Sequence, residues 1–374
     1  MSKTGKHKRI AISTGGGDCQ GLNAVIRAVV KAAKYRYNWD VIGVLDGLTG
    51  LIDTTKTKKL NISDVRGLLP KGGTIIGTAN KGNPLHYPVE VDGEIKYTDM
   101  RDKIVKNFHD LLLDALIMVG GDGTQSIAYE LYKKGIPVVG IPKTIDNDLS
   151  DTDMTFGFST AVQIAVDAID RLHSTAESHH RIMIIEVMGR YSGWIALHAG
   201  LGGGADIILI PEIPFDMDEI IEKILRRRNL GGRFSVVVVA EGAYPKGGER
   251  FIKRKATSEY DNELLGGIGH WLSKEIEKHL NAVETRVTVL GYTQRGGTPD
   301  AIDRILATRF GTYACELIDK DKFGKLVVLK GQNIESVALR SAIKGVKNVE
   351  PNGQIVKTCE SINICLGRNN KYLY

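Results

Sequence analysis

The stretch Ala115-Leu-Ile-Met-Val-Gly-Gly-Asp-Gly-Thr124 decides the fold class of this chain. Its apolar first half predicts a buried strand, and the glycines that follow predict a turn whose bare backbone N–H groups can approach a phosphate. The residues 124–131 then predict a helix start, so the positive end of a helix faces the same point. Asp122 stands at the carboxyl end of the strand, where a Mg²⁺ ligand is useful. A tight strand-to-helix turn without a ligand is the alternative for this stretch alone.

Further apolar runs alternate with amphipathic stretches along the chain. Runs without polar interruption, such as the valines at 236–239, predict strands covered on both faces, which is typical of parallel sheets between helices. We therefore expect an α/β fold with two doubly wound, Rossmann-like lobes, parallel-rich sheets, flanking helices and an active site in the cleft between the lobes. The segment 81–101 is rich in glycine, proline and charge, and we expect an irregular excursion or a hairpin there. The expected strands are 9–13, 41–45, 115–119, 137–141, 182–187, 207–210, 235–240, 286–290 and 326–329, and the expected helices are 22–35, 125–134, 162–175, 194–199, 217–228, 270–280 and 301–318.

The composition narrows the class of protein. A length of 374 residues with 42% hydrophobic content supports a large core and two lobes. The net charge of +6 is modest, the basic clusters are short and scattered, and aromatic residues make up only 6%, so we expect no nucleic-acid partner. The four cysteines lack zinc-site or disulfide-framework spacing. Without a signal-peptide pattern or an apolar run near the ~20 residues that span a bilayer, we expect a cytoplasmic protein that does not enter a membrane.

A second glycine-rich turn follows the first expected strand, in the stretch Ser13-Thr-Gly-Gly-Gly-Asp-Cys-Gln-Gly-Leu-Asn23. Three consecutive glycines allow the backbone to approach a ligand closely, and a helix is expected just behind them. An ordinary turn is the alternative, because the spacing fits neither of the common phosphate-binding glycine motifs. The residues 200–205 do fit Gly-x-Gly-x-x-Ala, but they follow an expected helix rather than a strand, so we expect no dinucleotide site there.

Acidic side chains follow the next strand, in the stretch Pro142-Lys-Thr-Ile-Asp-Asn-Asp148. If this backbone is extended, Asp146 and Asp148 lie on one side of it. Two carboxylates beside a phosphate site suit a general base and a residue of the metal's coordination shell. An Asp/Asn-rich turn with capping duties is the alternative.

Arginines form the last group of candidates. They stand at strand ends or in loops, often beside glycine, and the planar guanidinium group is suited to gripping a phosphate ester with two hydrogen bonds. His179 and His180 have no partners at metal-ligand spacing, so we expect them to be structural. The arginines in question are Arg181, Arg190, Arg286 and Arg295.

Together these motifs resemble the 6-phosphofructokinases over nearly the full length of the chain. One or two such motifs could arise by chance, but a set of this size in the same order is specific. The matching segments are Thr14-Gly-Gly-Gly-Asp18, Gly21-Leu-Asn23, Gly72-Gly-Thr74, Gly120-Gly-Asp-Gly123, Thr144-Ile-Asp-Asn-Asp148, Ser178-His-His-Arg181, Glu186-Val-Met-Gly-Arg-Tyr191, Glu241-Gly242, Thr285-Arg286, Leu290-Gly-Tyr-Thr-Gln-Arg-Gly-Gly297 and Asp303-Arg304.

The resemblance implies transfer of a phosphoryl group from ATP to the 1-hydroxyl of fructose 6-phosphate, the reaction of glycolysis that gives fructose 1,6-bisphosphate. It implies that Asp146 is the general base, that Thr144 positions the reactants, and that Arg190 steadies the sugar and the transition state. Asp122 would bind Mg²⁺, with Asp148 in the metal's outer shell. The implied donor-binding residues are Gly17, Asn80, Lys81, Gly121, Asp122, Gly123 and Thr124, and the implied sugar-phosphate residues are Thr144, Ile145, Asp146, Arg181, Met188, Gly189, Arg190, Glu241, Arg286, Tyr292, Thr293, Gln294 and Arg295.

The family pattern also implies an assembly and a division of labour. Residues 1–157 with about 294–345 would bind the nucleotide and Mg²⁺, and residues 158–293 with about 346–374 would bind the sugar phosphate. Arg181 and Arg286 match arginines that reach the 6-phosphate across a subunit interface, whereas Arg295 would grip it from within. We therefore expect a homodimer or a homotetramer with shared active sites.

Two positions bear on the phosphoryl donor. Members of the family that use ATP carry glycine where this chain has Gly123, and those that use pyrophosphate carry aspartate, which would repel a nucleotide phosphate. The residue before Thr144 is lysine in the pyrophosphate users, and it is Lys143 here. We give Gly123 more weight, because a steric and electrostatic block excludes ATP while a lysine only adds a cation. Pyrophosphate stays the second candidate donor.

Two further departures concern donor and sugar binding. Asn80 replaces an arginine that ATP users of the family place on the donor phosphates, and Lys81 could substitute for it. Tyr292 replaces a histidine of the sugar-phosphate site. One alternative for the whole chain is an NAD or lipid kinase that uses the turn at residues 120–124. Another is a non-catalytic sensing or scaffold protein on the same fold, which would be expected to have lost Asp122 or Asp146, and both are present.

Overall fold

The computed structural model describes residues 7–79, 82–254, 264–281, 283–343 and 345–369. The predicted donor-binding residues Asn80 and Lys81 lie outside these ranges. The chain divides into two compact units. Unit 1 comprises Met1–Ile145, Leu149–Ser159 and Arg295–Gly345, and unit 2 comprises Asp146–Asp148, Thr160–Gln294 and Val346–Tyr374.

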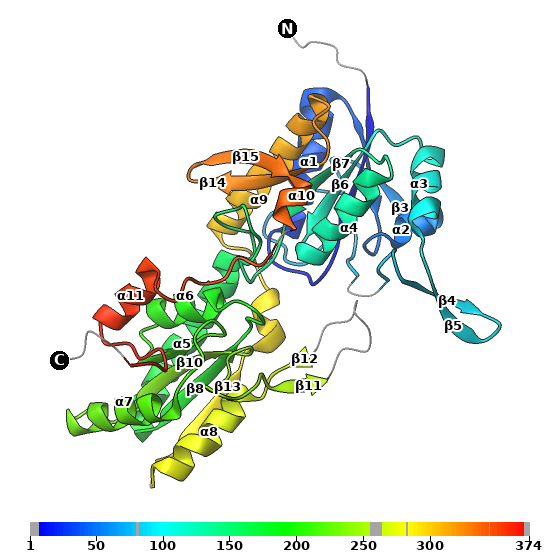
Figure 1. Ribbon diagram of the computed structural model, residues 1–374. Helices are drawn as coiled ribbons and strands as arrows, with labels where there is room; N and C mark the ends of the chain where they lie inside the picture. The colour runs from blue at the N-terminus through cyan, green and yellow to red at the C-terminus, as the bar shows by residue number, and fades with distance from the viewer. Residues whose placement is uncertain (1–6, 80–81, 255–263, 282, 344, 370–374) are drawn as a thin grey trace. The chain divides into compact units, whose positions relative to one another are not determined.

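Unit 1 is built on a seven-stranded sheet in the order β15-β14-β7-β6-β1-β2-β3 (Figure 1). The five central strands run parallel, and only the two edge strands are antiparallel to their neighbours. Central strands such as β6 are buried at every residue, as a parallel sheet with helices on both faces requires. The strands are β1 (Arg9–Thr14), β2 (Asp40–Val44), β3 (Thr57–Leu60), β6 (Ala115–Gly120), β7 (Val138–Pro142), β14 (Lys325–Lys330) and β15 (Asn333–Ala338).

Helices cover both faces of this sheet. On one face, apolar residues of α2, α3, α4 and α10 pack around Leu116, Met118 and Val138. On the other face α1 and α9 pack against each other, so closely that a Cβ at Gly311 would lie 2.9 Å from the Ala28 Cβ (Figure 1). The helices are α1 (Leu22–Ala32), which continues into a π-helical turn (Ala33–Tyr37), α2 (Thr49–Ile52), a 3₁₀ turn (Thr54–Lys56), α3 (Arg101–Asp110), α4 (Asp122–Lys133), α9 (Ala301–Asp319) and α10 (Leu339–Ala342).

A two-stranded hairpin, β4 (Tyr87–Val91) and β5 (Glu94–Thr98), extends away from the sheet of unit 1 (Figure 1). Its turn residues Asp92 and Gly93 both have positive φ, as a tight hairpin turn requires. This confirms the hairpin interpretation of the segment 81–101 for the part of it that the structure describes.

Unit 2 has a four-stranded parallel sheet in the order β13-β8-β10-β9. Val237 and Val239 of β10 face an apolar cluster with α7 and α8, whereas a Cβ at Gly200 of α6 would meet Val238 on the other face. The elements are α5 (Phe158–His179), β8 (Ile182–Val187), α6 (Trp194–Gly202), β9 (Ile207–Leu209), α7 (Met217–Asn229), β10 (Ser235–Ala240), β11 (Ile252–Arg254), β12 (Leu264–Leu265), α8 (Ile268–His279), β13 (Thr285–Val289), a 3₁₀ helix η3 (Gly291–Arg295) and α11 (Gln354–Ser361).

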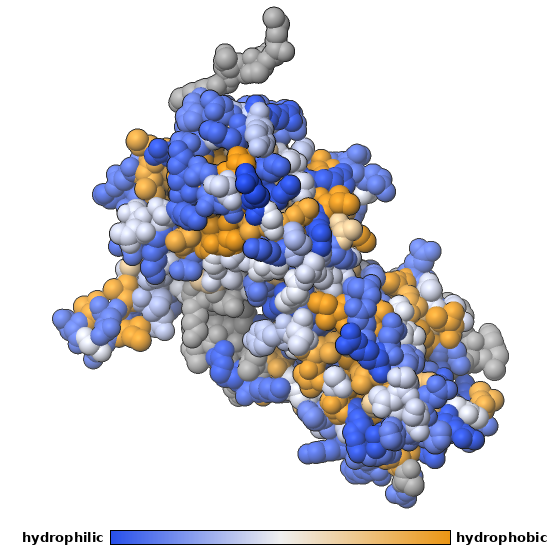
Figure 2. All heavy atoms as spheres, turned by 180° about the vertical axis from the view of Figure 1, so that it is seen from behind, coloured by the Kyte–Doolittle hydropathy of each residue, from blue (hydrophilic) through white to orange (hydrophobic). Residues whose placement is uncertain are grey.

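The predicted α/β class with parallel-rich sheets and flanking helices is confirmed. The face drawn in Figure 2 is mostly hydrophilic, with apolar residues in separate patches. Within the described ranges, no helix is both long and apolar enough to cross a bilayer.

Candidate active site

The order of strands in unit 1 places two glycine turns side by side. β1 lies between β2 and β6, so the strand order reverses at β1 and β6. The turn at 15–21 follows β1, and the turn at 120–123 follows β6. Ligands of open α/β sheets bind outside the carboxyl ends of the strands at such a switch point. The topology therefore favours this edge as the phosphate-binding site of unit 1.

Contacts tie the first glycine turn to its neighbours. The Gly15 N–H donates to the Val119 carbonyl over 2.9 Å, and the Thr78 hydroxyl donates to the Gly16 carbonyl over 2.6 Å. A Cβ at Gly15 would lie 2.8 Å from the Thr124 Oγ1. Gly16 has a φ of 75°, which favours glycine. The turn at 15–18 and the start of α4 thus touch each other, as the phosphate-cradle hypothesis expects.

Lys143 and Arg295 bring positive charge to the same turn. The Lys143 Nζ donates to the Gly17 carbonyl, although Lys143 is only 3% exposed. The Arg295 NH1 donates to the Asp18 carbonyl over 3.2 Å, and a Cβ at Gly17 would lie 2.8 Å from that NH1. Gly17 is therefore in contact with two cationic side chains of unit 1, which suits a site for anionic phosphates.

The second glycine turn opens directly into a helix. α4 begins at Asp122, three residues earlier than the predicted start at 125, so Asp122 and Gly123 belong to its first turn rather than to a loop. Both residues are exposed, and a Cβ at Gly123 would meet nothing within 4 Å. A helix N-terminus with exposed backbone N–H groups can bind a phosphate. The space beside Gly123 is therefore open, as expected if the glycine at this position leaves room for a nucleotide phosphate.

Asp122 is the only predicted metal ligand in this turn. Among the described residues, no group of three or more histidine, cysteine, aspartate or glutamate side chains is arranged to hold a metal ion. A single exposed carboxylate beside a phosphate site still fits Mg²⁺, which protein sites commonly bind through one or two carboxylates together with substrate phosphates and water.

In unit 2, three strand ends gather most of the predicted sugar-phosphate residues. β8 ends at Val187 before Met188, Gly189 and Arg190, and β10 ends before Glu241. β13 ends before η3, which carries Tyr292, Thr293 and Gln294. Because these strands are parallel neighbours, all three ends lie at one edge of the sheet. The structure thus brings these predicted residues together.

Hydrogen bonds join these strand ends. The Met188 N–H donates to the Gln294 Oε1 over 2.8 Å, and the Gly242 N–H donates to the Gly189 carbonyl over 3.1 Å. Gln294 is fully buried, so its carbonyl oxygen holds the backbone of Met188 instead of pointing to solvent. Tyr292 is 76% exposed, and the Thr293 hydroxyl folds back onto the Leu290 carbonyl over 2.6 Å.

The Asp146–Asp148 tripeptide belongs to unit 2, whereas Thr144 and Ile145 belong to unit 1. The Ser192 hydroxyl donates to the Asp146 carbonyl over 3.2 Å, and the Thr155 hydroxyl donates to the Thr144 carbonyl over 2.7 Å. The extended backbone on which the expectation about Asp146 and Asp148 depends is not present. Asn147 between them has a φ of 51°, in the left-handed region that asparagine tolerates, so the alternation of a strand does not apply.

Arg181 and Arg286 lie elsewhere in unit 2. Arg181 precedes β8 and Arg286 is the second residue of β13, so both lie at the amino-terminal edge of the sheet. Both bind the Glu284 carboxylate: the Arg181 Nε donates over 2.6 Å and the Arg286 NH2 also donates. Hydrogen bonding from Arg181 lowers the pKa of Glu284. Within one chain, these two arginines are separated from Arg190 by the length of β8.

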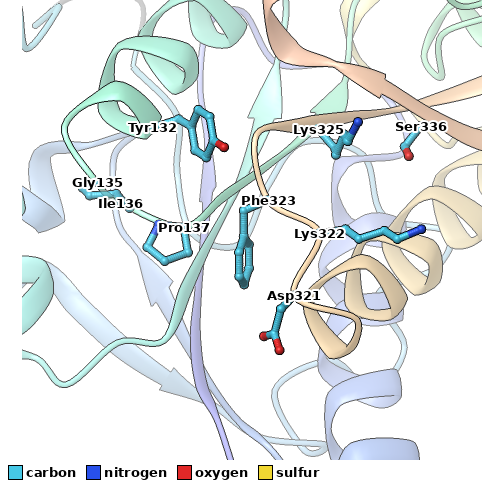
Figure 3. A pocket seen from close by; sticks show the side chains of 9 residues that line it. All are labelled: Tyr132, Gly135, Ile136, Pro137, Asp321, Lys322, Phe323, Lys325 and Ser336. Atoms are coloured by element: carbon cyan, nitrogen blue, oxygen red, sulfur yellow. The ribbon is translucent and has the colours of Figure 1, made fainter.

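A hollow of about 580 Å³ opens at another edge of unit 1 (Figure 3). Ile136 and Pro137 of its lining precede β7, and Lys325 begins β14, so it lies at the amino-terminal edge of that sheet. The glycine turns lie at the carboxyl edge, so this hollow is not the phosphate site. Its lining residues are Tyr132, Gly135, Ile136, Pro137, Asp321, Lys322, Phe323, Lys325 and Ser336.

Comparison with known proteins identifies the family. The family model described as Phosphofructokinase matches residues 9–318. The chain belongs to the phosphofructokinase family. It is 50% identical to the ATP-dependent 6-phosphofructokinase of Chloroflexus aurantiacus over 362 residues, which cover 97% of this chain and 98% of that protein. It is 48% identical to the pyrophosphate–fructose 6-phosphate 1-phosphotransferase of Streptomyces coelicolor over 344 residues, which cover 92% of this chain and 96% of that protein.

Solved phosphofructokinase structures share the fold. The crystal structure of Pichia pastoris phosphofructokinase in the T-state superposes with a TM-score of 0.77 and 33% identity. The match covers 96% of this chain, which spans 39% of the Pichia chain.

Two residues near the site of this phosphofructokinase were not predicted. Ser192 and Lys347 both contact the Asp146–Asp148 backbone. Ser192 follows the predicted Met188–Arg190 segment closely and could have been inferred from that proximity. Lys347 lies beyond the residues that the family model matches, and no motif surrounds it.

Proposed function

We propose that this chain is an ATP-dependent 6-phosphofructokinase, which transfers the terminal phosphoryl group of ATP to the 1-hydroxyl of fructose 6-phosphate. The observation that carries the proposal is the pair of glycine turns at the switch point of unit 1, with Lys143 and Arg295 held against the first turn. The names of the relatives at about half identity support ATP as the donor. Like a glycolytic enzyme, it would act in the cytoplasm.

In this proposal unit 1 binds the nucleotide. The backbone N–H groups of Gly17 and of the turn at 121–124 bind the donor phosphates, with the α4 N-terminus oriented toward them. Asp122 would hold Mg²⁺, which would neutralise charge on the donor phosphates. Lys143 contributes further positive charge to this site. Arg295, which the family resemblance assigns to the 6-phosphate of the sugar, donates to the Asp18 carbonyl beside the same turn. Asn80 and Lys81 complete the proposed donor site by family resemblance alone.

Unit 2 then binds the acceptor. Met188, Gly189, Arg190 and Glu241 at the strand ends bind the sugar, and residues 292–294 of η3 lie at the same edge. Asp146 takes the proton of the 1-hydroxyl as that oxygen bonds to the γ-phosphorus. The bond between this phosphorus and the β,γ-bridging oxygen breaks, and ADP leaves. Thr144 and Arg190 position the groups and stabilise the negative charge.

The position of Arg181 and Arg286 supports an oligomer. β8 has six residues, so at ~3.3 Å per residue its two ends lie about 16 Å apart. Arg181 and Arg286 thus lie at the opposite edge of this sheet from Arg190, where both bind Glu284. We propose that both arginines bind the 6-phosphate in a neighbouring copy, within a homodimer or homotetramer.

A coupled assay with fructose 6-phosphate, Mg²⁺ and either ATP or pyrophosphate tests the reaction. We expect turnover with ATP, and absence of turnover with both donors would contradict the proposal. Arg286→Ala tests the assembly: mixed oligomers of Arg286→Ala and Asp146→Asn chains should recover activity that neither variant shows alone. Failure to recover it in oligomers that do exchange subunits would contradict the shared site.

Pyrophosphate is a second candidate donor, and the structural observation that favours it is the buried Lys143 against the first glycine turn. A compact donor could use this cation without a nucleotide pocket. The Streptomyces relative carries the pyrophosphate-dependent name at 48% identity. Comparing kcat/KM for the two donors decides between them. The NAD or lipid kinase interpretation is set aside, because the family match covers residues 9–318.

A further inference from the structure

Residues 346–349, which lie beyond the family-matched residues 9–318, contact the Asp146–Asp148 tripeptide. Lys347 is the residue of contact: its backbone N–H donates to the Asp148 carbonyl over 2.7 Å, and its Nζ donates to the Asn147 Oδ1 over 3.1 Å. Both hydrogen bonds lie within unit 2. The proposed general base, Asp146, is thus followed directly by two residues that Lys347 holds.

The same segment is fixed on its other side. The Trp194 Nε1–H donates to the Lys347 carbonyl over 2.8 Å, and the Lys347 Nζ lies 5.7 Å from the centroid of the Trp194 ring, within cation–π range. Two residues further on, the Val349 N–H donates to the Glu212 Oε1 over 2.8 Å. The Gly193 N–H donates to the same carboxylate over 3.0 Å.

These contacts join two parts of the proposed acceptor site. Gly193 and Trp194 come three and four residues after Arg190, which follows β8. Ser192, which directly precedes Gly193, donates to the Asp146 carbonyl. The residues 346–349 therefore tie the tripeptide of the base to the turn that carries the sugar-binding Arg190, through both backbone and side-chain groups.

The backbone of the tripeptide needs such support. Asn147 is 5% exposed and has a φ of 51°, a conformation that costs free energy for any residue except glycine. Asparagine tolerates it better than most residues, and its amide oxygen is the atom that the Lys347 Nζ binds. The hydrogen bond from Lys347 thus fixes the side chain of Asn147, whose backbone is strained and which directly follows Asp146.

We propose that Lys347 is a positioning residue of the phosphoryl transfer: with residues 346–349 it fixes the backbone that aims the Asp146 carboxylate at the acceptor hydroxyl. The proposal rests on the proposed function for the role of Asp146. In this role Lys347 acts through the backbone and side chain of its neighbours Asn147 and Asp148. Its loss affects the chemical step more than the binding of either substrate.

Steady-state kinetics of Lys347→Met tests this role. Methionine keeps the length of the side chain and the backbone N–H bond to Asp148 but removes the charged donor to Asn147. We expect kcat to fall roughly 10- to 100-fold, as for the loss of a charged hydrogen bond, with the KM for ATP within about twofold of the wild type. Lys347→Arg keeps a charged donor, and we expect it to recover most of kcat.

Lys357→Met is the matched control, because Lys357 is an exposed lysine of the same C-terminal region, on α11. A Lys347→Met variant with the kcat of this control would overturn the proposal. So would a lowered kcat that Lys347→Arg does not improve. If Lys347→Met does not fold, Asn147→Gly replaces it, because glycine keeps the left-handed backbone and removes the bonded oxygen; the same fall in kcat is expected.

Hydrogen exchange measured by mass spectrometry gives a readout that needs no turnover. Peptides covering residues 144–150 should exchange faster in Lys347→Met than in the wild type, and at the wild-type rate in Lys357→Met. Equal exchange in all three proteins overturns the proposal even if the enzyme is active. Conversely, a wild type that phosphorylates no fructose 6-phosphate refutes the proposed function, while the exchange experiment still decides whether Lys347 orders this backbone.

Discussion

The Lys143 side chain is buried against the first glycine turn, where its Nζ donates a hydrogen bond to the Gly17 carbonyl oxygen. This bond joins the residue after β7 to the turn after β1, two strands that are not adjacent in the sheet. The bond holds a buried cation beside the turn that we propose binds the donor phosphates. In that proposal the positive charge is already in place before the donor binds.

Lys143→Met should weaken binding of the phosphoryl donor. We expect the donor KM to rise roughly 10- to 100-fold, because a charged hydrogen-bond donor is lost beside the phosphates, with a smaller change in the KM for fructose 6-phosphate. Initial-rate measurements at varied donor concentration check this. Lys103→Met, at an exposed position of α3, is the control. An unchanged donor KM would remove Lys143 from the donor site.

Gly123→Asp should change donor preference without harming the fold. A Cβ at Gly123 meets nothing within 4 Å, so the free energy of unfolding should change by less than about 0.5 kcal/mol. The new carboxylate would repel a nucleotide phosphate, and we expect kcat/KM for ATP to fall at least about tenfold relative to pyrophosphate. Gly123→Ala, which adds the Cβ without charge, separates size from charge. If Ala and Asp act alike, repulsion is not the cause.

Asp146→Asn should abolish most of the chemistry. Asparagine keeps the shape of the side chain but cannot accept the proton of the 1-hydroxyl, so turnover should fall roughly 10²–10⁴-fold. Binding of fructose 6-phosphate, measured by calorimetry, should persist. Near-normal turnover would remove Asp146 from the role of general base.

Glu212 should make stability depend on pH. Burial raises the pKa of Glu212 above its ordinary value of 4.5, against the opposing effect of the N–H groups of Val349 and Gly193. A raised carboxyl pKa means that the folded state binds the proton more tightly than the unfolded state. The stability that this proton contributes is present below pH 4.5 and is lost as pH rises through the folded-state pKa.

Glu212→Gln cannot titrate, so it isolates that effect. We expect the free energy of unfolding of the wild type, relative to Glu212→Gln, to be more favourable at pH 4 than at pH 7. Urea titrations at a series of pH values measure it. A difference that stays constant across this range, or that grows toward pH 7, would contradict the assignment.

The cysteines should not react in the folded protein. Burial raises the pKa of Cys19 and Cys315 to about 12 and the pKa of Cys359 and Cys365 to about 11, and all four are buried free thiols. Only a thiolate reacts readily with a disulfide reagent. We expect Ellman's reagent at pH 8 to label none of them quickly before unfolding and four after it. Rapid labelling of the native protein would contradict the burial.

Much of the fold could be predicted because apolar runs and glycine turns leave local signals. The buried strands Ile182–Val187 and Ser235–Ala240 have the predicted bounds, and the other expected strands differ by one residue at one or both ends. Both edge strands of the unit 1 sheet were missed. One of them, Thr57–Leu60, carries two exposed lysines, so no apolar run marks it. A strand with a neighbour on just one side can form without a pronounced hydrophobic pattern.

The site was predicted less evenly. Motifs identified the candidate site residues that directly follow strands, since each of these motifs comes after an apolar run in the sequence. The left-handed backbone of Asn147 could not be predicted, because asparagine adopts it only where surrounding contacts fix it. The contact of Lys347 with Asn147 joins residues 200 positions apart in the chain, and no local pattern reports such a contact.

The unit boundary between Ile145 and Asp146 has a mechanical consequence. The proposed base belongs to the same compact unit as Arg190 and Glu241, although the strand that leads to it belongs to the unit of the glycine turns. The spacing between the proposed base and these two proposed sugar-binding residues is therefore set by the packing of a single unit.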